Sequence, residues 1–173
     1  MGKHKNKLPD KWLEYKPYND IVYNTNIIPF KTPFNKNISD PDIDSWKVEN
    51  VIEKIPNLGA VIDLTNTYRY YDSNEFKNKG IIYKKLKLKG QTIPSDNAVI
   101  SFMKIINSIN NLIDKDKLIG VHCTHGINRT GYLICRYIKN VQKIDTDTAL
   151  EYFKKARGYE IRKDEYIQKL YLY

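Results

Sequence analysis

At 173 residues the chain is long enough for one domain with its own core, and 41% hydrophobic and 12% aromatic residues exclude a disordered protein. The 29 Lys and Arg outnumber the 20 Asp and Glu, and the net charge of +9 favours an anionic partner such as nucleic acid or phosphate, although a solvated lysine-rich surface explains the charge equally well. Two cysteines exclude a disulfide framework and favour a reducing intracellular compartment, either the nucleus or the cytoplasm. The lack of a long apolar run and of a signal-peptide core argues against membrane insertion and secretion.

The first half of the chain predicts two helices and two strands. Ser45 is a favourable N-cap for a helix that ends at about Ile55. The run "GAVIDLT" (59–65) predicts a buried strand, and a polar loop follows it. The run "IIYKKLKL" (81–88) predicts a second strand, and apolar residues at helical spacing predict an amphipathic helix over 97–113.

The second half predicts a third strand and three helices. These elements cover residues 117–123, 129–140, 146–156 and 163–171. Strands that alternate with helices indicate an α/β fold with a largely parallel sheet, in which the loops after the strands gather at one edge. Without repeats or linkers, residues 1–173 are expected to form one monomeric domain, with 1–16 as a basic, partly flexible N-terminal segment.

The loop after the third strand, "HCTHGINRTG" (122–131), combines a cysteine with an arginine at the start of a helix. The residues between Cys123 and Arg129 include a glycine and no acid: Thr124, His125, Gly126, Ile127 and Asn128. A strand that turns tightly into a helix points backbone N–H groups inward, which makes a cradle for an anion and lowers the pKa of a thiol placed there. Arg129 can donate two hydrogen bonds to a phosphoryl group. These groups suit phosphoryl transfer to sulfur and hydrolysis of the cysteinyl-phosphate, with no metal ion or other cofactor.

The cluster of His122, Cys123 and His125 also raises the possibility of zinc. A structural zinc site needs four ligands, and the remaining candidates, His4 and Cys135, stand elsewhere in the chain. Cys135 belongs to an apolar helix stripe and is expected to pack in the core. A metal site is therefore not expected.

Four stretches resemble a known family. The loop matches the Cys-x5-Arg-Ser/Thr signature of cysteine-dependent phosphatases. Together with "AVIDLTNTYRYYD", "GIIYKKLKLKGQTIP" and "FKKARGYEIRKDEYIQKLY", it is similar to the branch that acts on RNA 5′ ends, which includes triphosphatase domains of metazoan mRNA capping enzymes and baculovirus RNA phosphatases. The resemblance covers most of residues 45–170 and implies the dual-specificity phosphatase fold. It implies that Cys123 is the nucleophile and Arg129 the phosphate clamp. It further implies that Thr130 helps the thiolate to leave and that His122 tunes Cys123 from behind the loop.

Two departures from the family pattern bear on the substrate. Where protein-directed relatives carry an aspartic general acid, this chain has Gln91, and nearby Asp96 is expected to begin a helix. A diphosphate leaving group needs no proton, so the missing acid favours cleavage of a phosphoanhydride. Asp63 either assists as an acid or caps its local turn with Thr65. Because no Lys-x-Asp-Gly motif occurs, a capping reaction would need a separate guanylyltransferase as partner.

Basic and aromatic residues are expected to contact the RNA. The basic residues assigned to its phosphates are Lys85, Lys87, Lys89, Arg157 and Arg162. Tyr68, Tyr70 and Tyr71 can stack on a terminal base or pack against the protein. The leading hypothesis is a metal-independent RNA 5′-triphosphatase or polynucleotide 5′-phosphatase that removes the γ-phosphate and, in a further cycle, the β-phosphate. The alternatives are a protein tyrosine or dual-specificity phosphatase, and a catalytically silent phosphate- or RNA-binding module.

Overall fold

The computed structural model describes residues 7–35 and 45–173. Within them, four parallel strands form one sheet in the order β1-β4-β2-β3. The strands are β1 (Ile27–Lys31), β2 (Leu58–Asp63), β3 (Ile82–Lys85) and β4 (Leu118–Cys123). The predicted α/β class with a parallel sheet is confirmed.

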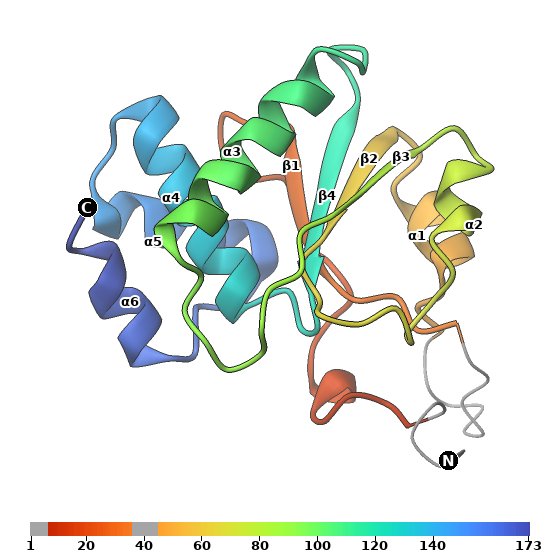
Figure 1. Ribbon diagram of the computed structural model, residues 1–173, viewed down its shortest axis with the longest axis horizontal. Coiled ribbons are helices and arrows are strands. Elements are labelled where there is room, and N and C mark those ends of the chain that lie inside the picture. The colour runs from red at the N-terminus through yellow and green to blue at the C-terminus, as the bar shows by residue number, and fades with distance from the viewer. Residues whose placement is uncertain (1–6, 36–44) are drawn as a thin grey trace.

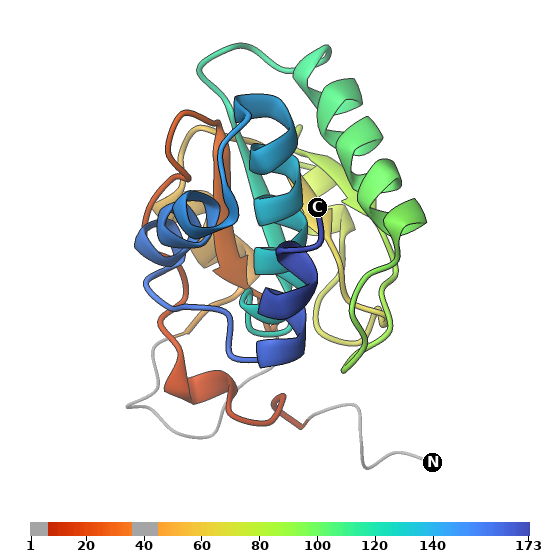
Figure 2. The ribbon, with the colours of Figure 1, turned by 90° about the vertical axis from the view of Figure 1, so that its left-hand side faces the viewer.

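Helices cover both faces of this sheet. Helices α3, α4, α5 and α6 lie on one face, and α1 and α2 lie on the other (Figure 1). The helices are α1 (Val48–Lys54), α2 (Asn74–Lys77), α3 (Asp96–Asn110), α4 (Asn128–Gln142), α5 (Thr146–Arg157) and α6 (Asp164–Leu170). Figure 2 shows α4 in the middle of its layer, between α3 and α5. Each layer encloses its own hydrophobic core, which holds the sheet from both sides.

The parallel arrangement brings the ends of β2 and β4 together. Their register places Asp63 beside His122, and on the other side of β4 the last residue of β1, Lys31, pairs with Cys123. All six residues of β4 are buried, which explains its continuous apolar run. The loops that follow β2 and β4 therefore start at neighbouring points of one sheet edge, as the sequence predicted.

Strand β1 was not predicted from the sequence. It contains Pro29, which has no N–H to donate to a neighbouring strand. The structure places β1 at the edge of the four-stranded sheet, where a proline is tolerated, and the outer side of β1 forms only an isolated bridge between Phe30 and Tyr18 among the described residues. The four-residue helix α2 within the expected polar region was also missed, because so short a helix has no periodicity to recognise.

The starts of two helices show different capping. The helix expected from Ser45 begins at Val48, and Lys47 is its N-cap. The Asn50 side chain accepts hydrogen bonds from the Lys47 N–H at 2.9 Å and from the Ser45 hydroxyl at 3.1 Å, so Asn50 organises this end. For α3 the prediction is confirmed, since Asp96 is its first residue, after the N-cap.

The N-terminal segment crosses the sheet edge where the strands end. Trp12 is buried and donates a hydrogen bond from Nε1 to the carbonyl of Thr32 at 2.9 Å. Lys31 Nζ donates to the carbonyls of Trp12 and Tyr15 at 3.0 and 2.8 Å. Part of the segment expected over 1–16 is therefore anchored below the sheet (Figure 1), and residues 1–6 lie outside the described residues.

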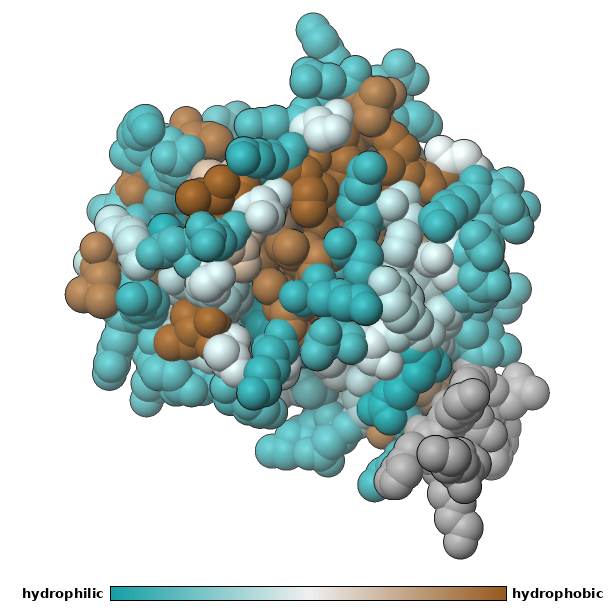
Figure 3. Space-filling view, viewed as in Figure 1, coloured by the Kyte–Doolittle hydropathy of each residue, from teal (hydrophilic) through white to brown (hydrophobic). Residues whose placement is uncertain are grey.

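The surface is mixed in polarity. In the space-filling view, hydrophilic side chains cover most of the visible face, and a strip of hydrophobic residues crosses its centre (Figure 3). Among the described residues, no helix is both long enough and apolar enough to cross a membrane.

Candidate active site

The loop between β4 and α4 turns its first carbonyl groups away from the space above Cys123. The carbonyl of Thr124 accepts a hydrogen bond from the Thr32 N–H at 3.0 Å. The carbonyl of His125 accepts one from Arg157 Nη2 at 2.9 Å. Because N–H and C=O point in opposite directions across a trans peptide, these bonds turn the neighbouring amides toward Cys123. The local geometry suits the binding of an anion.

Two glycines allow the backbone to approach its neighbours closely. Gly126 has a φ of +69°, and a Cβ atom there would lie 2.1 Å from the carbonyl oxygen of Phe30. A Cβ atom at Gly131, in the first turn of α4, would lie 2.7 Å from the side chains of Phe153 and Ile161. The loop and the start of α4 thus fit only with glycine at these two positions.

The surroundings of Cys123 favour its thiolate. Burial of the side chain by itself raises the pKa of the thiol. The positive charge of Arg129, the Thr130 hydroxyl and the backbone N–H groups of Thr130 and Ile127 outweigh burial, so the pKa of Cys123 is lowered. Burial raises the pKa of Cys135, which lies in the hydrophobic core as expected. The two cysteines therefore differ in reactivity.

Arg129 and Thr130 face the loop from the start of α4. Arg129 Nη1 donates to the carbonyl of Leu88 at 2.9 Å, and Nη2 donates to Thr124 Oγ1 at 3.1 Å. The Thr130 hydroxyl is buried and hydrogen-bonds no nitrogen or oxygen atom among the described residues. Its proton can therefore be directed at the Cys123 sulfur.

A buried polar network lies behind the loop. His122 Nε2 is 2.7 Å from the Tyr71 hydroxyl. Asp63 Oδ2 accepts hydrogen bonds from Tyr71 at 3.1 Å, from Tyr83 at 2.7 Å and from Lys85 Nζ at 2.9 Å. Burial lowers the pKa of His122 although Asp63 opposes that shift, and the ring is held behind the loop by its contact with Tyr71.

Asp63 and Lys85 are bound to each other and to the turn after β2. Asp63 Oδ1 accepts hydrogen bonds from the N–H and the hydroxyl of Thr65 at 2.8 and 2.7 Å. Burial raises the pKa of Asp63, but His122 and Lys85 outweigh that effect and lower it. These contacts favour the turn-capping role of Asp63 over that of an acid catalyst. Lys85 also donates to the carbonyl of Thr67 at 2.6 Å, so it has a structural role, and its expected contact with substrate stays a prediction.

A cavity of about 290 Å³ opens above Cys123. Its lining combines residues of the loop between β4 and α4 with residues from four other segments. The described residues that line it are Pro9, Asp10, Arg69, Tyr70, Gly90, Gln91, Cys123, Thr124, His125, Asn128, Arg129, Lys163 and Tyr166. Three of these described residues, Arg69, Arg129 and Lys163, are cations, and Asp10 is the one acid among them. The cavity suits a ligand that carries several negative charges.

The other predicted basic residues lie outside this lining. Lys87, Lys89 and Arg162 are exposed and do not belong to the described residues that line the cavity. Arg157 is fully buried, and its burial lowers its pKa to about 10. It binds the carbonyl of His125 from behind the loop. Arg157 therefore supports the loop from its far side, and its direct contact with substrate stays a prediction.

Several residues of the cavity were missed in the sequence. Arg69 stands in the quoted stretch "NTYRYYD", and Lys163 ends the basic stretch "KKARGYEIRK". Both stretches belong to those that carry the family resemblance, but the sequence did not indicate which of their side chains face the cysteine. No sequence pattern indicated that Pro9 and Asp10 line the cavity, because their position depends on the contacts of Trp12 and Lys31.

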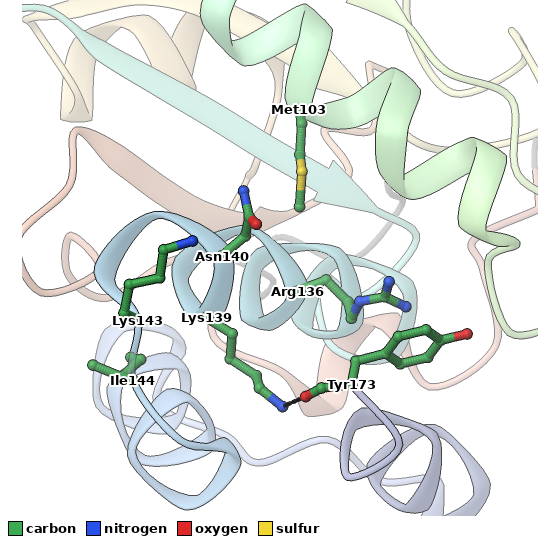
Figure 4. Close-up of a pocket in the computed structure, with 7 residues that line it drawn as sticks. All are labelled: Met103, Arg136, Lys139, Asn140, Lys143, Ile144 and Tyr173. Carbon is green, nitrogen blue, oxygen red and sulfur yellow. Dashed lines mark hydrogen bonds between the residues drawn. The ribbon is translucent and has the colours of Figure 1, made fainter.

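A larger cavity of about 530 Å³ lies along the second half of α4, and Figure 4 shows its lining. Lys139 there donates a hydrogen bond to the carbonyl of Tyr173 at 2.6 Å. Arg136 pairs with Asp96 at 3.1 Å. Its seven described residues include no cysteine, histidine or acid, so we place the chemistry in the smaller cavity.

The histidines near the loop have partners other than a metal. His122 contacts Tyr71, and His125 Nε2 lies 2.6 Å from the carbonyl of Asp10. Within residues 7–35 and 45–173, no group of three or more His, Cys, Asp and Glu side chains is placed to hold a metal ion.

Solved phosphatase structures share this fold. The structure of PTPMT1 aligns with a TM-score of 0.67 at 17% identity, covering 90% of this chain and 92% of that chain. A kinase associated phosphatase aligns with a TM-score of 0.66 at 15% identity, covering 83% of each chain. At such low identity the likeness establishes the fold alone.

Relatives with more similar sequences show to which family the chain belongs. The "Tyrosine-protein phosphatase" of Autographa californica nuclear polyhedrosis virus is 39% identical, over 94% of this chain and 98% of its own length. The human "RNA/RNP complex-1-interacting phosphatase" is 37% identical over 95% of this chain, which spans 52% of that protein. The family model described as "Dual specificity phosphatase, catalytic domain" matches residues 45–173. The chain therefore belongs to the dual specificity phosphatase family and is a cysteine-based phosphatase.

Proposed function

We propose that the protein removes the γ-phosphate from triphosphate-ended RNA by a metal-independent reaction at Cys123. The observation that carries the proposal is the set of three cations, Arg69, Arg129 and Lys163, around the cavity of one nucleophile. A phosphotyrosine brings one phosphate to such a cavity, whereas an RNA triphosphate brings three. The name of the human relative, which refers to an RNA/RNP complex, supports a ligand of this class.

In the first step the Cys123 sulfur attacks the γ-phosphorus, and the bond from that phosphorus to the bridging oxygen breaks. The loop amides and the Arg129 guanidinium bind the oxygens of the transferred group. The RNA leaves as a diphosphate, which is stable as an anion and needs no proton. Gln91, an amide without acidic function, lines the cavity and is compatible with such a leaving group.

In the second step a water molecule attacks the phosphorus of the cysteinyl-phosphate. The S–P bond breaks, inorganic phosphate forms, and the sulfur departs as a thiolate. The Thr130 hydroxyl can donate a hydrogen bond to this sulfur, which makes the thiolate a better leaving group. A second cycle on the diphosphate end removes the β-phosphate and yields a monophosphate.

Hydrolysis of phosphoproteins is the second candidate function. The viral relative is called a tyrosine-protein phosphatase, and Asp10 is the one acid among the described residues that line the cavity. A tyrosine leaving group needs a proton, which a carboxylic acid on the N-terminal segment can supply.

The test compares phosphate release from triphosphate-ended RNA and from a phosphotyrosine peptide, both in the presence of a chelator. We expect kcat/KM to be at least about tenfold higher on RNA, and Cys123→Ser serves as the blank. The reverse ranking, with peptide hydrolysis lost in Asp10→Asn, would establish the protein phosphatase instead.

A further inference from the structure

We propose that the first nucleoside of the RNA binds in a second cavity, with its base stacked on Tyr68. This second cavity lies beside the cavity above Cys123, which is called the phosphate cavity below. This inference rests on the proposed function and names what holds the substrate beyond its phosphates.

The second cavity has a volume of about 520 Å³ and is formed largely by the loop that follows β2. Arg69 and Tyr70 line both this cavity and the one above Cys123. The two cavities are therefore neighbours, with Arg69 and Tyr70 at their boundary, and the second one is the adjacent space for a ligand that extends from Cys123 past Arg69. A nucleotide whose terminal phosphate sits on Cys123 has this extended shape.

The charge changes from one cavity to the other. The phosphate cavity has three cations in its described lining, whereas the second cavity has the carboxylates of Asp72 and Glu75 beside Arg69. Further phosphates would be repelled by these carboxylates, while an uncharged nucleoside would not be. Carboxylate oxygens can also accept hydrogen bonds from the amino groups of bases. The order of charges thus matches a triphosphate followed by a nucleoside.

The three tyrosines of this loop differ in their availability. The Tyr71 hydroxyl is held between Asp63 at 3.1 Å and His122 at 2.7 Å. Tyr70 is only 7% exposed. Tyr68 is 62% exposed, so it is the most accessible of the three to a base. Base stacking on an aromatic ring tolerates any base, because each base has a flat π face.

The Tyr68 ring is also held in place. The amino groups of Lys85 and Lys87 lie 4.7 and 4.6 Å from its centre. Ammonium groups at this distance are attracted to the ring, and Lys85 is itself fixed by Asp63 at 2.9 Å. A ring held in this way loses little freedom when a base stacks on it.

The experiment separates the nucleoside from the phosphates. Dissociation constants are measured with the Cys123→Ser protein for two probes, a triphosphate-ended dinucleotide and inorganic tripolyphosphate. We expect Tyr68→Ala to weaken binding of the dinucleotide about tenfold and to leave binding of tripolyphosphate unchanged. Tyr68→Trp should bind both probes as the parent does. Tyr23, which is 64% exposed and lies outside both described cavities, gives the matched control Tyr23→Ala.

Three results would overturn the inference. Equal weakening of both probes would show that Tyr68 supports the phosphate cavity, and no weakening of the dinucleotide would show that the base lies elsewhere. A phosphotyrosine peptide is measured as a third probe, and a loss of binding confined to that peptide would assign the cavity to a protein ligand and would also reject the inference. Because binding is measured without turnover, a wild-type enzyme that releases no phosphate from RNA would reject the proposed function alone.

Discussion

Cys123 is buried and nevertheless has a lowered pKa, because Arg129, Thr130 and two amides act on its sulfur. Replacing the sulfur by a hydroxyl keeps the size of the side chain but removes the anion at neutral pH. We expect Cys123→Ser to lose turnover of triphosphate-ended RNA and to retain binding, since the loop amides and Arg129 remain. Phosphate release measured beside equilibrium binding tests this prediction. Turnover well above that of buffer would mean that another residue attacks phosphorus.

The planar fork of Arg129 matters as much as its charge. Its two terminal nitrogens bond to Leu88 and Thr124, which fixes the guanidinium plane beside the loop. Lysine keeps the charge but lacks two parallel donors. We expect Arg129→Lys to lower kcat by about a hundredfold on a small aryl phosphate. Near-normal kcat in this variant would remove the proposed role in transition-state binding.

The Thr130 hydroxyl contributes to the pH dependence. It lowers the pKa of Cys123 by hydrogen bonding to the thiolate, so Thr130→Val should raise that pKa. At a given pH less thiolate is then present. The midpoint of alkylation by iodoacetamide and the acidic limb of kcat/KM should both move to higher pH. Cys135 has a raised pKa, so mass spectrometry of the alkylated protein reports on Cys123. An unchanged midpoint would show that the hydroxyl does not act on the sulfur.

At the scale of elements, the ion pair between β2 and β3 has a structural role that the sequence did not reveal. The side chains of Lys85 and Asp63 are 9% and 4% exposed, and they lie 2.9 Å apart. Removing the lysine leaves a buried carboxylate without its charged partner. We expect Lys85→Met to lower the free energy of unfolding by about 3 kcal/mol.

Urea unfolding tests this expectation, and Lys87→Met is the control on the same stretch. Lys87 is exposed, so its replacement should change the free energy of unfolding by less than about 0.5 kcal/mol. Equal effects of the two variants would contradict a special role for the Lys85–Asp63 pair.

Elements with strong patterns could be predicted from the sequence, and elements fixed by distant contacts could not. The apolar runs of β2 and β4 and the periodic helices α3, α4 and α5 were recognised because their burial pattern is local. Strand β1 was missed because its pairing with β4 outweighs the proline in its sequence. The start of α1 was misplaced because the N-cap is Lys47, whose N–H donates to the Asn50 side chain inside the helix, while the Ser45 hydroxyl only donates to that same side chain.

The same distinction applies to the site. Cys123 and Arg129 belong to one continuous loop, so their proximity follows from a tight turn between strand and helix. The supporting role of Arg157 could not be predicted from the sequence, because only packing shows that it holds the carbonyl of His125. Arg69 and Lys163 reach the cavity from loops far apart in the sequence. Which cations face the cysteine is therefore a property of the folded chain.

At the scale of the whole molecule, the residues that give the net charge of +9 do not all have the same role. Many of the lysines are solvated, and the stretch that begins at Lys85 contains that partly buried cation and two exposed ones, Lys87 and Lys89. Lys163 lines the cavity, where its amino group donates a hydrogen bond to the Gln91 side chain. A general surface charge would act equally on any anion, whereas Lys163 should act on phosphates bound next to Cys123.

This difference gives the last prediction, which concerns the response to salt. Each phosphate contact to single-stranded RNA contributes a slope of about 0.7 in a plot of log affinity against log salt concentration. Lys163→Ala should raise KM for triphosphate-ended RNA several-fold and reduce the slope by roughly that amount. Hydrolysis of a small aryl phosphate, which occupies only the position at Cys123 and Arg129, should change much less. Lys104, exposed on α3, gives the control Lys104→Ala, which should leave both substrates unaffected. If Lys104→Ala changed KM and the salt slope on RNA as much as Lys163→Ala does, the lysines would act as a diffuse field of charge. If Lys163→Ala impaired hydrolysis of both substrates equally, the bond of Lys163 to Gln91 would support the shape of the cavity.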